Sequence, residues 1–248
     1  MKPLCVVTGT SSGIGQTLAR MLVERDWEVV GVARRPAALA GPNYRHISLD
    51  LSDVERVQRY FETTFVEHTT LAGRPRVGLV NNAAVVGPIG SPQSFSAGDF
   101  SRALNLNVVA PVWLTGFFSK ACADAPLTVV NVSSGAAFRP IPGWSAYCAG
   151  KAALRMAGRV FGKDVERAEI FRGRVGSLAV VNYSPGVVDT AMQGEVRQAP
   201  VSGFPQLQRF LNLHEKGKLK STEIPAAEIC ALLDREDLPP YSERAYGK

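Results

Sequence analysis

The sequence predicts an α/β fold in which helices flank a doubly wound parallel sheet of about seven strands. Apolar runs of strand length alternate with segments of helical periodicity, and this alternation implies parallel pairing. The chain has 248 residues, of which 46% are hydrophobic, so it can bury one large core. We therefore expect one domain, residues 1–248, with ligands bound beyond the carboxyl ends of its strands.

The elements follow from local patterns. The expected strands are the apolar runs 4–9, 27–34, 44–51, 77–84, 127–134 and 177–186. Helical spacing of apolar residues predicts helices at 13–26, 52–68, about 98–124 and about 146–170. Ser52 and Glu55 have the spacing of a capping box at the start of the second helix. From 184 to about 225 the strand pattern stops and proline and glycine interrupt short amphipathic pieces, which predicts a helical flap over the substrate site.

Composition argues against several classes of protein. The formal net charge is +6, but the basic residues are scattered among acids, so no nucleic-acid partner is expected. The first apolar run is shorter than a signal-peptide core and no run of eighteen apolar residues occurs, which favours a cytoplasmic protein with no membrane partner. The four cysteines lie far apart and share no ligand spacing with the three histidines, so no metal site is expected.

A glycine-rich turn, "TGTSSGIG" at 8–15, follows the first expected strand and opens a helix. Gly9 permits the tight turn, Gly13 allows a ligand to approach the backbone, and Gly15 allows close packing of the helix. The free amides of the turn and the helix dipole suit a pyrophosphate, as in a Rossmann-type dinucleotide site, although a purely structural turn is the alternative. The expected cofactor contacts here are Gly9, Ser11, Ser12, Gly13, Ile14 and Gly15.

Later strand ends supply the remaining cofactor contacts. Arg34 and Arg35 follow the second strand, where an NAD site usually has an acidic residue. Arginines at this place match a 2′-phosphate, which favours NADP(H). The alternative is that the two arginines are only solvated charges on a loop. We expect the end of the third strand to lie near the adenine ring. The small residues of "NNAA" are expected to let the ribose lie close to the backbone. These contacts are Asp50, Leu51, Asn82, Ala83 and Ala84.

Tyr147 and Lys151 stand four positions apart in "YCAGK", on one face of an expected helix. Such a pair also arises by chance in an ordinary amphipathic helix. Ser134, at the end of the fifth strand, precedes Tyr147 by thirteen residues. Together with the glycine-rich turn, "NNAA", Asn107 in "LNLN" and "SPGVVDT", this order resembles the short-chain dehydrogenase/reductase family over nearly the whole chain. Within the family, "GWSAYCAGKAA", "NYSPGVVDTAMQ" and "KGKL" resemble the branch of sepiapterin reductases and bacterial benzil (1,2-diketone) reductases.

The resemblance implies an NADPH-dependent carbonyl reductase with Asn107, Ser134, Tyr147 and Lys151 as the catalytic set. An ammonium near Tyr147 would favour its phenolate and bring its pKa toward neutrality, so Tyr147 could donate the proton. Lys151 would hold the nicotinamide ribose, Ser134 the substrate oxygen, and Asn107 a water that links Lys151 to solvent. Further nicotinamide contacts would be Pro185, Gly186, Val188 and Thr190. Relatives pack through the helices at about 98–124 and 146–170, which implies a homodimer or homotetramer.

The substrate is expected to be a small carbonyl compound held by mostly apolar residues, namely Ala136, Phe138, Trp144, Met192 and Phe204. Such a pocket favours an aromatic 1,2-diketone resembling benzil. Sepiapterin is the alternative, but in the C-terminal "YSERAYGK" Arg244 stands where sepiapterin reductases have an aspartate, with Glu243 beside it. A second alternative, a non-catalytic NADP-sensing module, would be expected to lack Tyr147 or Lys151.

Overall fold

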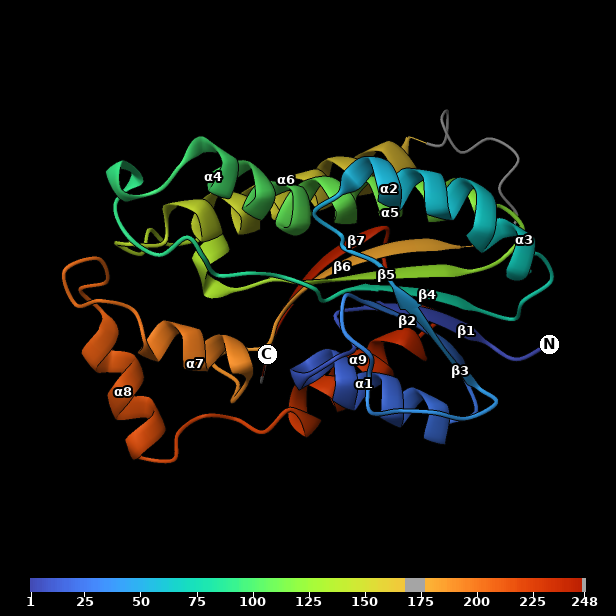
Figure 1. The fold of residues 1–248 in the computed structure, drawn as a ribbon. Coiled ribbons are helices and arrows are strands. Elements are labelled where there is room, and N and C mark those ends of the chain that lie inside the picture. The colour runs from blue at the N-terminus through green and yellow to red at the C-terminus, as the bar shows by residue number, and fades with distance from the viewer. Residues whose placement is uncertain (168–176, 247–248) are drawn as a thin grey trace.

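The computed structural model describes residues 1–167 and 177–246, and its centre is a parallel sheet with the strand order β3-β2-β1-β4-β5-β6-β7 (Figure 1). The strands are β1 (Leu4–Thr8), β2 (Glu28–Ala33), β3 (Tyr44–Ser48), β4 (Val77–Asn81), β5 (Leu127–Val132), β6 (Leu178–Ser184) and β7 (Tyr241–Ala245). The sequence runs locate the starts of the first six strands to within one residue. The doubly wound α/β fold that the alternation predicts is therefore confirmed.

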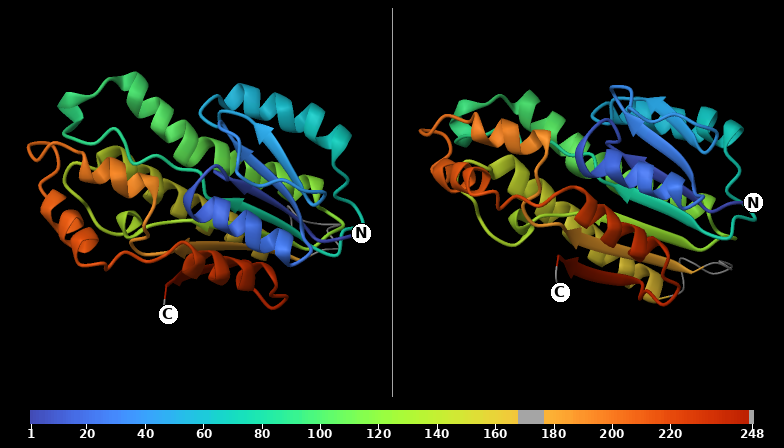
Figure 2. Two further views of the ribbon diagram at one scale, coloured as in Figure 1. Left: turned by 60° about the horizontal axis from the view of Figure 1, so that its bottom comes forward. Right: turned by 90° about the horizontal axis from the view of Figure 1, so that it is seen from below.

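Helices cover both faces of the sheet, as Figures 1 and 2 show. One face carries α2 (Val54–Tyr60), α3 (Val66–His68), α4 (Ala97–Leu104), α5 (Ala110–Ala121) and α6 (Ser145–Glu166), and the other carries α1 (Gly13–Glu24) and α9 (Glu223–Leu233). The expected flap contains α7 (Ala191–Arg197) and α8 (Leu207–Glu215), which lie beyond the carboxyl ends of the strands. Within the described residues, no helix has the length and apolar character needed to cross a membrane.

Three buried clusters hold these layers together. The cluster under α2 and α5 is mostly aliphatic and contains a group of aromatic rings, in which Phe61 and Phe118 are completely buried and meet edge to face. On the opposite face, α1 and α9 bury aliphatic side chains such as Leu18 and Ile229. A third cluster lies under the flap, where Trp144 stacks on Phe204 with ring centroids 5.1 Å apart. The third cluster fixes α7 and α8 to the start of α6, because burying aromatic surface favours that packing.

Several helix ends differ from the expected ones. The N-cap of α2 is Asp53, whose carboxylate accepts a hydrogen bond from the Arg56 amide, and not Ser52. The Ser52 hydroxyl lies before the cap and donates to the Asp50 carboxylate at 2.8 Å. The expected helix at 98–124 is two helices joined by a π-helical turn, Asn105–Val109. Residues 168–170 of the helix expected at 146–170 lie outside the described residues.

Candidate active site

A cavity of about 840 Å³ opens at the carboxyl ends of the strands, between the sheet and the flap. This is where the sequence predicts ligand binding, because parallel strands place all their carboxyl ends at one edge of the sheet. Nearly all the expected cofactor residues line this cavity: Gly9, Ser11, Ser12, Gly13, Ile14, Arg34, Arg35, Asp50, Leu51, Asn82, Ala83, Ala84, Tyr147, Lys151, Pro185, Gly186, Val188 and Thr190. Gly15 does not line it.

Gly15 instead allows the glycine-rich turn to close on β4. A Cβ at Gly15 would stand 2.4 Å from both the Asn82 Nδ2 and the Gly9 carbonyl oxygen. The Asn82 Nδ2 itself donates to the Thr8 carbonyl oxygen at 2.8 Å, so the amide has no free direction in which to move. Gly9 and Gly13 have φ angles of 77° and 61°, in the left-handed region that favours glycine. The turn therefore depends on glycine at all three positions, for two different reasons.

Gly15→Ala should disrupt this turn. We expect a loss of unfolding free energy of about 1–3 kcal/mol, as for an overpacked core, and dinucleotide affinity at least about tenfold weaker. Gly116→Ala on α5 is the matched control, because nothing lies within 4 Å of its added Cβ. Urea unfolding and a fluorescence titration with NADPH measure the two effects. If Gly15→Ala bound NADPH as tightly as the wild type, the close approach of Asn82 to Gly15 would not matter for cofactor binding.

Two arginines lie at the end of the cavity formed by the strand ends of β2 and β3. Arg34 and Arg35 are exposed, and the Arg34 Nη1 lies 3.8 Å from the Asp50 carboxylate. Burial opposes ionisation of Asp50, but hydrogen bonds from Ser52 and the charge of Arg34 bring its pKa below the ordinary value. Among the described residues Arg35 has no ion pair, so its guanidinium is available to an anion.

Tyr147 and Lys151 both face the cavity from the first two turns of α6, and both side chains are buried. The Lys151 Nζ lies 5.7 Å from the centroid of the Tyr147 ring and donates to the Val132 carbonyl oxygen at 2.7 Å. Ser134 lines the cavity at the end of β5, where its Oγ accepts a hydrogen bond from the Ala136 amide at 3.2 Å. Three of the four expected catalytic side chains therefore meet at one place.

The pKa of Tyr147 shifts in the direction opposite to the expected one. Burial raises the pKa of Tyr147 to about 12, although hydrogen bonding with Ser134 works in the opposite sense. Burial lowers the pKa of Lys151 to about 8. In the protein alone, desolvation therefore outweighs the attraction between ammonium and phenolate. Tyr147 is held in its protonated form, which is the form that a proton donor needs.

Asn107 lies next to this site without lining the cavity. It sits in the π-helical turn between α4 and α5, where its side chain is 1% exposed. Its amide makes two bonds to one residue, since Nδ2 donates to the Val85 carbonyl at 2.9 Å and Oδ1 accepts from the Val85 N–H at 3.0 Å. Asn107 therefore holds the segment after β4 in place, and its side chain does not point into the cavity.

The substrate side contains only part of the expected set. Ala136, Trp144 and Met192 line the cavity. Phe138 does not: its ring is 53% exposed and packs under the Arg155 guanidinium, 4.2 Å from the ring centroid. Phe204 is fully buried behind Trp144. These two placements differ from the expectation because apolar character alone does not say which surface a side chain covers.

Several residues that line the cavity belong to no sequence motif that could have identified them. The polar ones on the substrate and nicotinamide side are Arg139, Gln193, Glu195, Arg209, Lys220 and Tyr246. The Lys220 Nζ donates to the Pro185 carbonyl oxygen at 3.2 Å and lies 3.3 Å from the centroid of the Tyr246 ring. Backbone pairing of Lys220 with Val187 and Asp189 brings the return of the flap to this place. No sequence signal could have located this contact, because it joins segments that only the folded chain brings together.

The C-terminal strand settles which residue faces the cavity. Neither Glu243 nor Arg244 lines it, whereas Ala245 and Tyr246 do. Glu243 is held elsewhere, since its carboxylate lies 2.9 Å from Arg155 and accepts a hydrogen bond from the Tyr241 hydroxyl at 2.6 Å.

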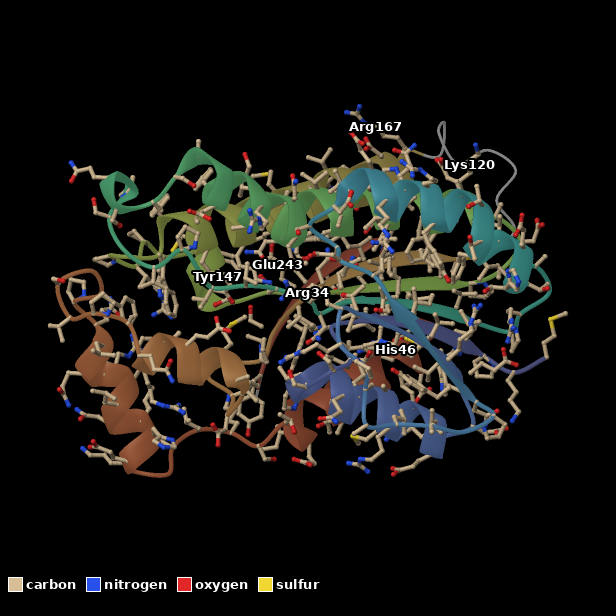
Figure 3. All side chains as sticks on the ribbon, in the orientation of Figure 1. Arg34, His46, Lys120, Tyr147, Arg167 and Glu243 are labelled. Atoms are coloured by element: carbon tan, nitrogen blue, oxygen red, sulfur yellow. The ribbon has the colours of Figure 1, made fainter. Side chains whose placement is uncertain are left out.

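In Figure 3, Tyr147 and Arg34 lie at the strand ends, and Lys120 and Arg167 lie at the opposite end of the helical layer.

Comparison with known proteins agrees with this geometry. The family model "short chain dehydrogenase" matches residues 3–200. A benzil reductase ((S)-benzoin forming) of Bacillus subtilis is 34% identical over 236 residues, which cover 94% of this chain and 93% of the relative. A sepiapterin reductase of Bos taurus is 30% identical over 269 residues, with 95% and 91% covered.

Solved structures show the same fold. A short chain dehydrogenase/reductase of Saccharomyces cerevisiae superposes with a TM-score of 0.81 at 24% identity, over 100% of this chain and 97% of the other. A 4-hydroxyisoleucine dehydrogenase in complex with NADH superposes with a TM-score of 0.77 at 18% identity, over 98% and 96%. With its sheet, its strand-end cavity and a family match over most of its length, the chain belongs to the short-chain dehydrogenases, nicotinamide-dependent oxidoreductases that act on C=O and CH–OH groups.

Proposed function

We propose that the protein is an NADPH-dependent reductase of aromatic 1,2-diketones resembling benzil, with Tyr147 as the proton donor. The observation that carries the proposal is that the buried Tyr147 shares the cavity with Lys151 and Ser134, next to an apolar wall formed by Ala136 and Trp144. A proton donor needs a proton at working pH and a route to the developing alkoxide. An aromatic substrate needs an apolar wall against which its rings can lie.

The cavity fits a dinucleotide. Gly9 and Gly13 line the cavity at the start of α1, where backbone amides and the helix dipole favour a pyrophosphate. When bound, the nicotinamide supplies the hydride. Thr190 and Gly186 lie along the cavity wall, where they would orient the carboxamide end, and Lys151 would hold the neighbouring ribose.

The chain's own residues then have distinct roles. Ser134 orients the carbonyl oxygen of the substrate, Tyr147 donates its proton to that oxygen, and the ammonium of Lys151 stabilises the phenolate that remains. Asn107 is a positioning residue, because it fixes the segment after β4 through Val85. Arg34 and Arg35 would bind a 2′-phosphate, which supports NADPH over NADH.

Sepiapterin is the alternative substrate, since a sepiapterin reductase is among the relatives. The cavity supports it less well. An anchor for a guanidine-like pterin edge must accept hydrogen bonds, and the C-terminal strand offers none from Glu243, which is paired with Arg155. A non-catalytic NADP-sensing module is disfavoured for a different reason: such a module has no need of Tyr147 and Lys151, which this chain retains together.

The test is the initial rate of NADPH oxidation with benzil and with sepiapterin, and NADH serves as the comparison cofactor. We expect fast turnover of benzil with NADPH, at least about tenfold slower turnover with NADH, and little turnover of sepiapterin. The double variant Arg34→Met/Arg35→Met should raise the KM for NADPH about tenfold or more and change that for NADH much less. A preference for sepiapterin would replace the diketone proposal, and equal use of NADH would refute the role of the two arginines.

A further inference from the structure

Arg139 occupies an unusual position beside the proposed oxyanion contact. It follows the 3₁₀ turn Gly135–Ala137, whose N-cap is Ser134, and its side chain lines the cavity. The Arg139 Nη2 lies 3.0 Å from the place where a Cβ of Gly135 would be. Because Gly135 has no side chain, the guanidinium can lie over the turn at Gly135, the residue that follows Ser134.

The guanidinium of Arg139 has no ion-pair partner. In residues 1–167 and 177–246, none of the ion pairs includes it, although Glu195 lines the same cavity. The other cations named on this side of the cavity have partners: Lys151 donates to the Val132 carbonyl and Lys220 to the Pro185 carbonyl. Arg209 donates to Gln206 at 3.5 Å and lies over the Phe210 ring. A planar guanidinium has five N–H donors in a fixed fork, and those of Arg139 are available to a ligand.

We infer that Arg139 binds the second, non-reacting carbonyl oxygen of a 1,2-diketone and so selects vicinal dicarbonyls over simple ketones. This inference rests on the proposed function. Ser134 and Tyr147 would hold the oxygen that is reduced, and in a 1,2-diketone the second oxygen is carried by the adjacent carbon. Arg139 lines the same cavity as Ser134 and Tyr147, and its guanidinium lies over Gly135, the residue that follows Ser134, so it is the donor that we assign to the second oxygen. A simple ketone has no acceptor at this position and gains nothing from Arg139.

Two substrates of nearly the same shape test the inference. Benzil has two adjacent carbonyls, and deoxybenzoin has the same two phenyl rings with one carbonyl replaced by CH₂. The readout is the ratio of kcat/KM for benzil to kcat/KM for deoxybenzoin, with NADPH. Arg139→Met keeps the unbranched stem and removes the donors. We expect the ratio to fall about tenfold, the effect of losing a hydrogen bond to a charged group.

Arg167→Met is the matched control, because Arg167 follows the last turn of α6, at the far end from Tyr147 (Figure 3). Its ratio should equal that of the wild type. An unchanged ratio in Arg139→Met, with benzil still reduced by the wild type, would overturn the inference and leave the proposed function standing. No reduction of benzil by the wild type would overturn both. Phenylglyoxylate forms a third arm: a loss confined to this 2-oxo acid would assign Arg139 to a carboxylate and overturn the diketone assignment.

Discussion

Tyr147→Phe is expected to lower kcat for carbonyl reduction by about 10²–10⁴-fold, the usual contribution of a positioned acid. The phenylalanine ring keeps the edge-to-face packing on Trp144, whose centroid lies 5.4 Å from that of Tyr147. The change therefore removes the acidic proton with little change in packing. Steady-state kinetics with benzil and NADPH measure the loss, and a fluorescence titration should show nearly unchanged NADPH affinity.

Tyr183→Phe is a suitable comparison for that experiment. Tyr183 is also a buried tyrosine, 1% exposed, and its hydroxyl donates to the Glu228 carboxylate at 2.6 Å. Losing this bond to a charged group should reduce unfolding free energy by about 1.5–3 kcal/mol, with kcat at the wild-type level. If Tyr147→Phe retained wild-type kcat, or if both variants lost activity equally, Tyr147 would not be the proton donor.

Much of the fold could be predicted because its strands are buried on both faces. A run such as Leu127–Val132 is apolar throughout, and such runs stand out from amphipathic helices. The edge strand β7 is half polar, so no apolar run marks it. The π-helical turn at Asn105–Val109 was equally hidden, since its residues continue the helical pattern on either side. Local sequence thus reveals burial well and irregular hydrogen bonding poorly.

The candidate site could be predicted to the extent that it lies at strand ends. Arg34 directly follows β2 and Ser134 stands two residues after the end of β5, and the parallel sheet brings both to one edge. Arg139 and Lys220 reach the cavity in another way, through a turn that folds back over Gly135 and through the return of the flap. These placements depend on tertiary contacts, which a scan of local patterns does not contain.

Lys151 is the clearest case in which function and stability are in conflict. Its ammonium is 3% exposed, and the Val132 carbonyl oxygen is the one hydrogen-bond acceptor found for it among the described residues. Burial lowers its pKa to about 8, against an ordinary value of 10.5. A lysine whose pKa is lower in the folded protein favours unfolding while it is charged, and this penalty disappears as pH rises from the folded toward the unfolded pKa. The proposed role explains why the chain keeps a charge there.

Lys151→Met is therefore expected to lose activity while its folded state is relieved of the cost of the buried charge. Without the ammonium beside Tyr147, kcat/KM for benzil should fall at least about 10²-fold. At pH 7 the variant escapes a penalty on the order of 3 kcal/mol, partly offset by leaving the Val132 carbonyl unpaired. Because deprotonation relieves the wild type, the stability of the variant minus that of the wild type should shrink by about 2 kcal/mol between pH 7 and pH 9.5.

Urea unfolding of both proteins at several pH values measures this difference, and titrations common to both cancel in it. Lys163→Met on the exposed end of α6 is the matched control, since its side chain is 75% exposed and an exposed ion pair of this kind contributes only about 0–1 kcal/mol. A difference for Lys151→Met that is constant from pH 7 to pH 9.5 would mean that Lys151 titrates as an ordinary lysine. The ammonium would then cost the fold nothing, and its place beside Tyr147 would need no functional explanation.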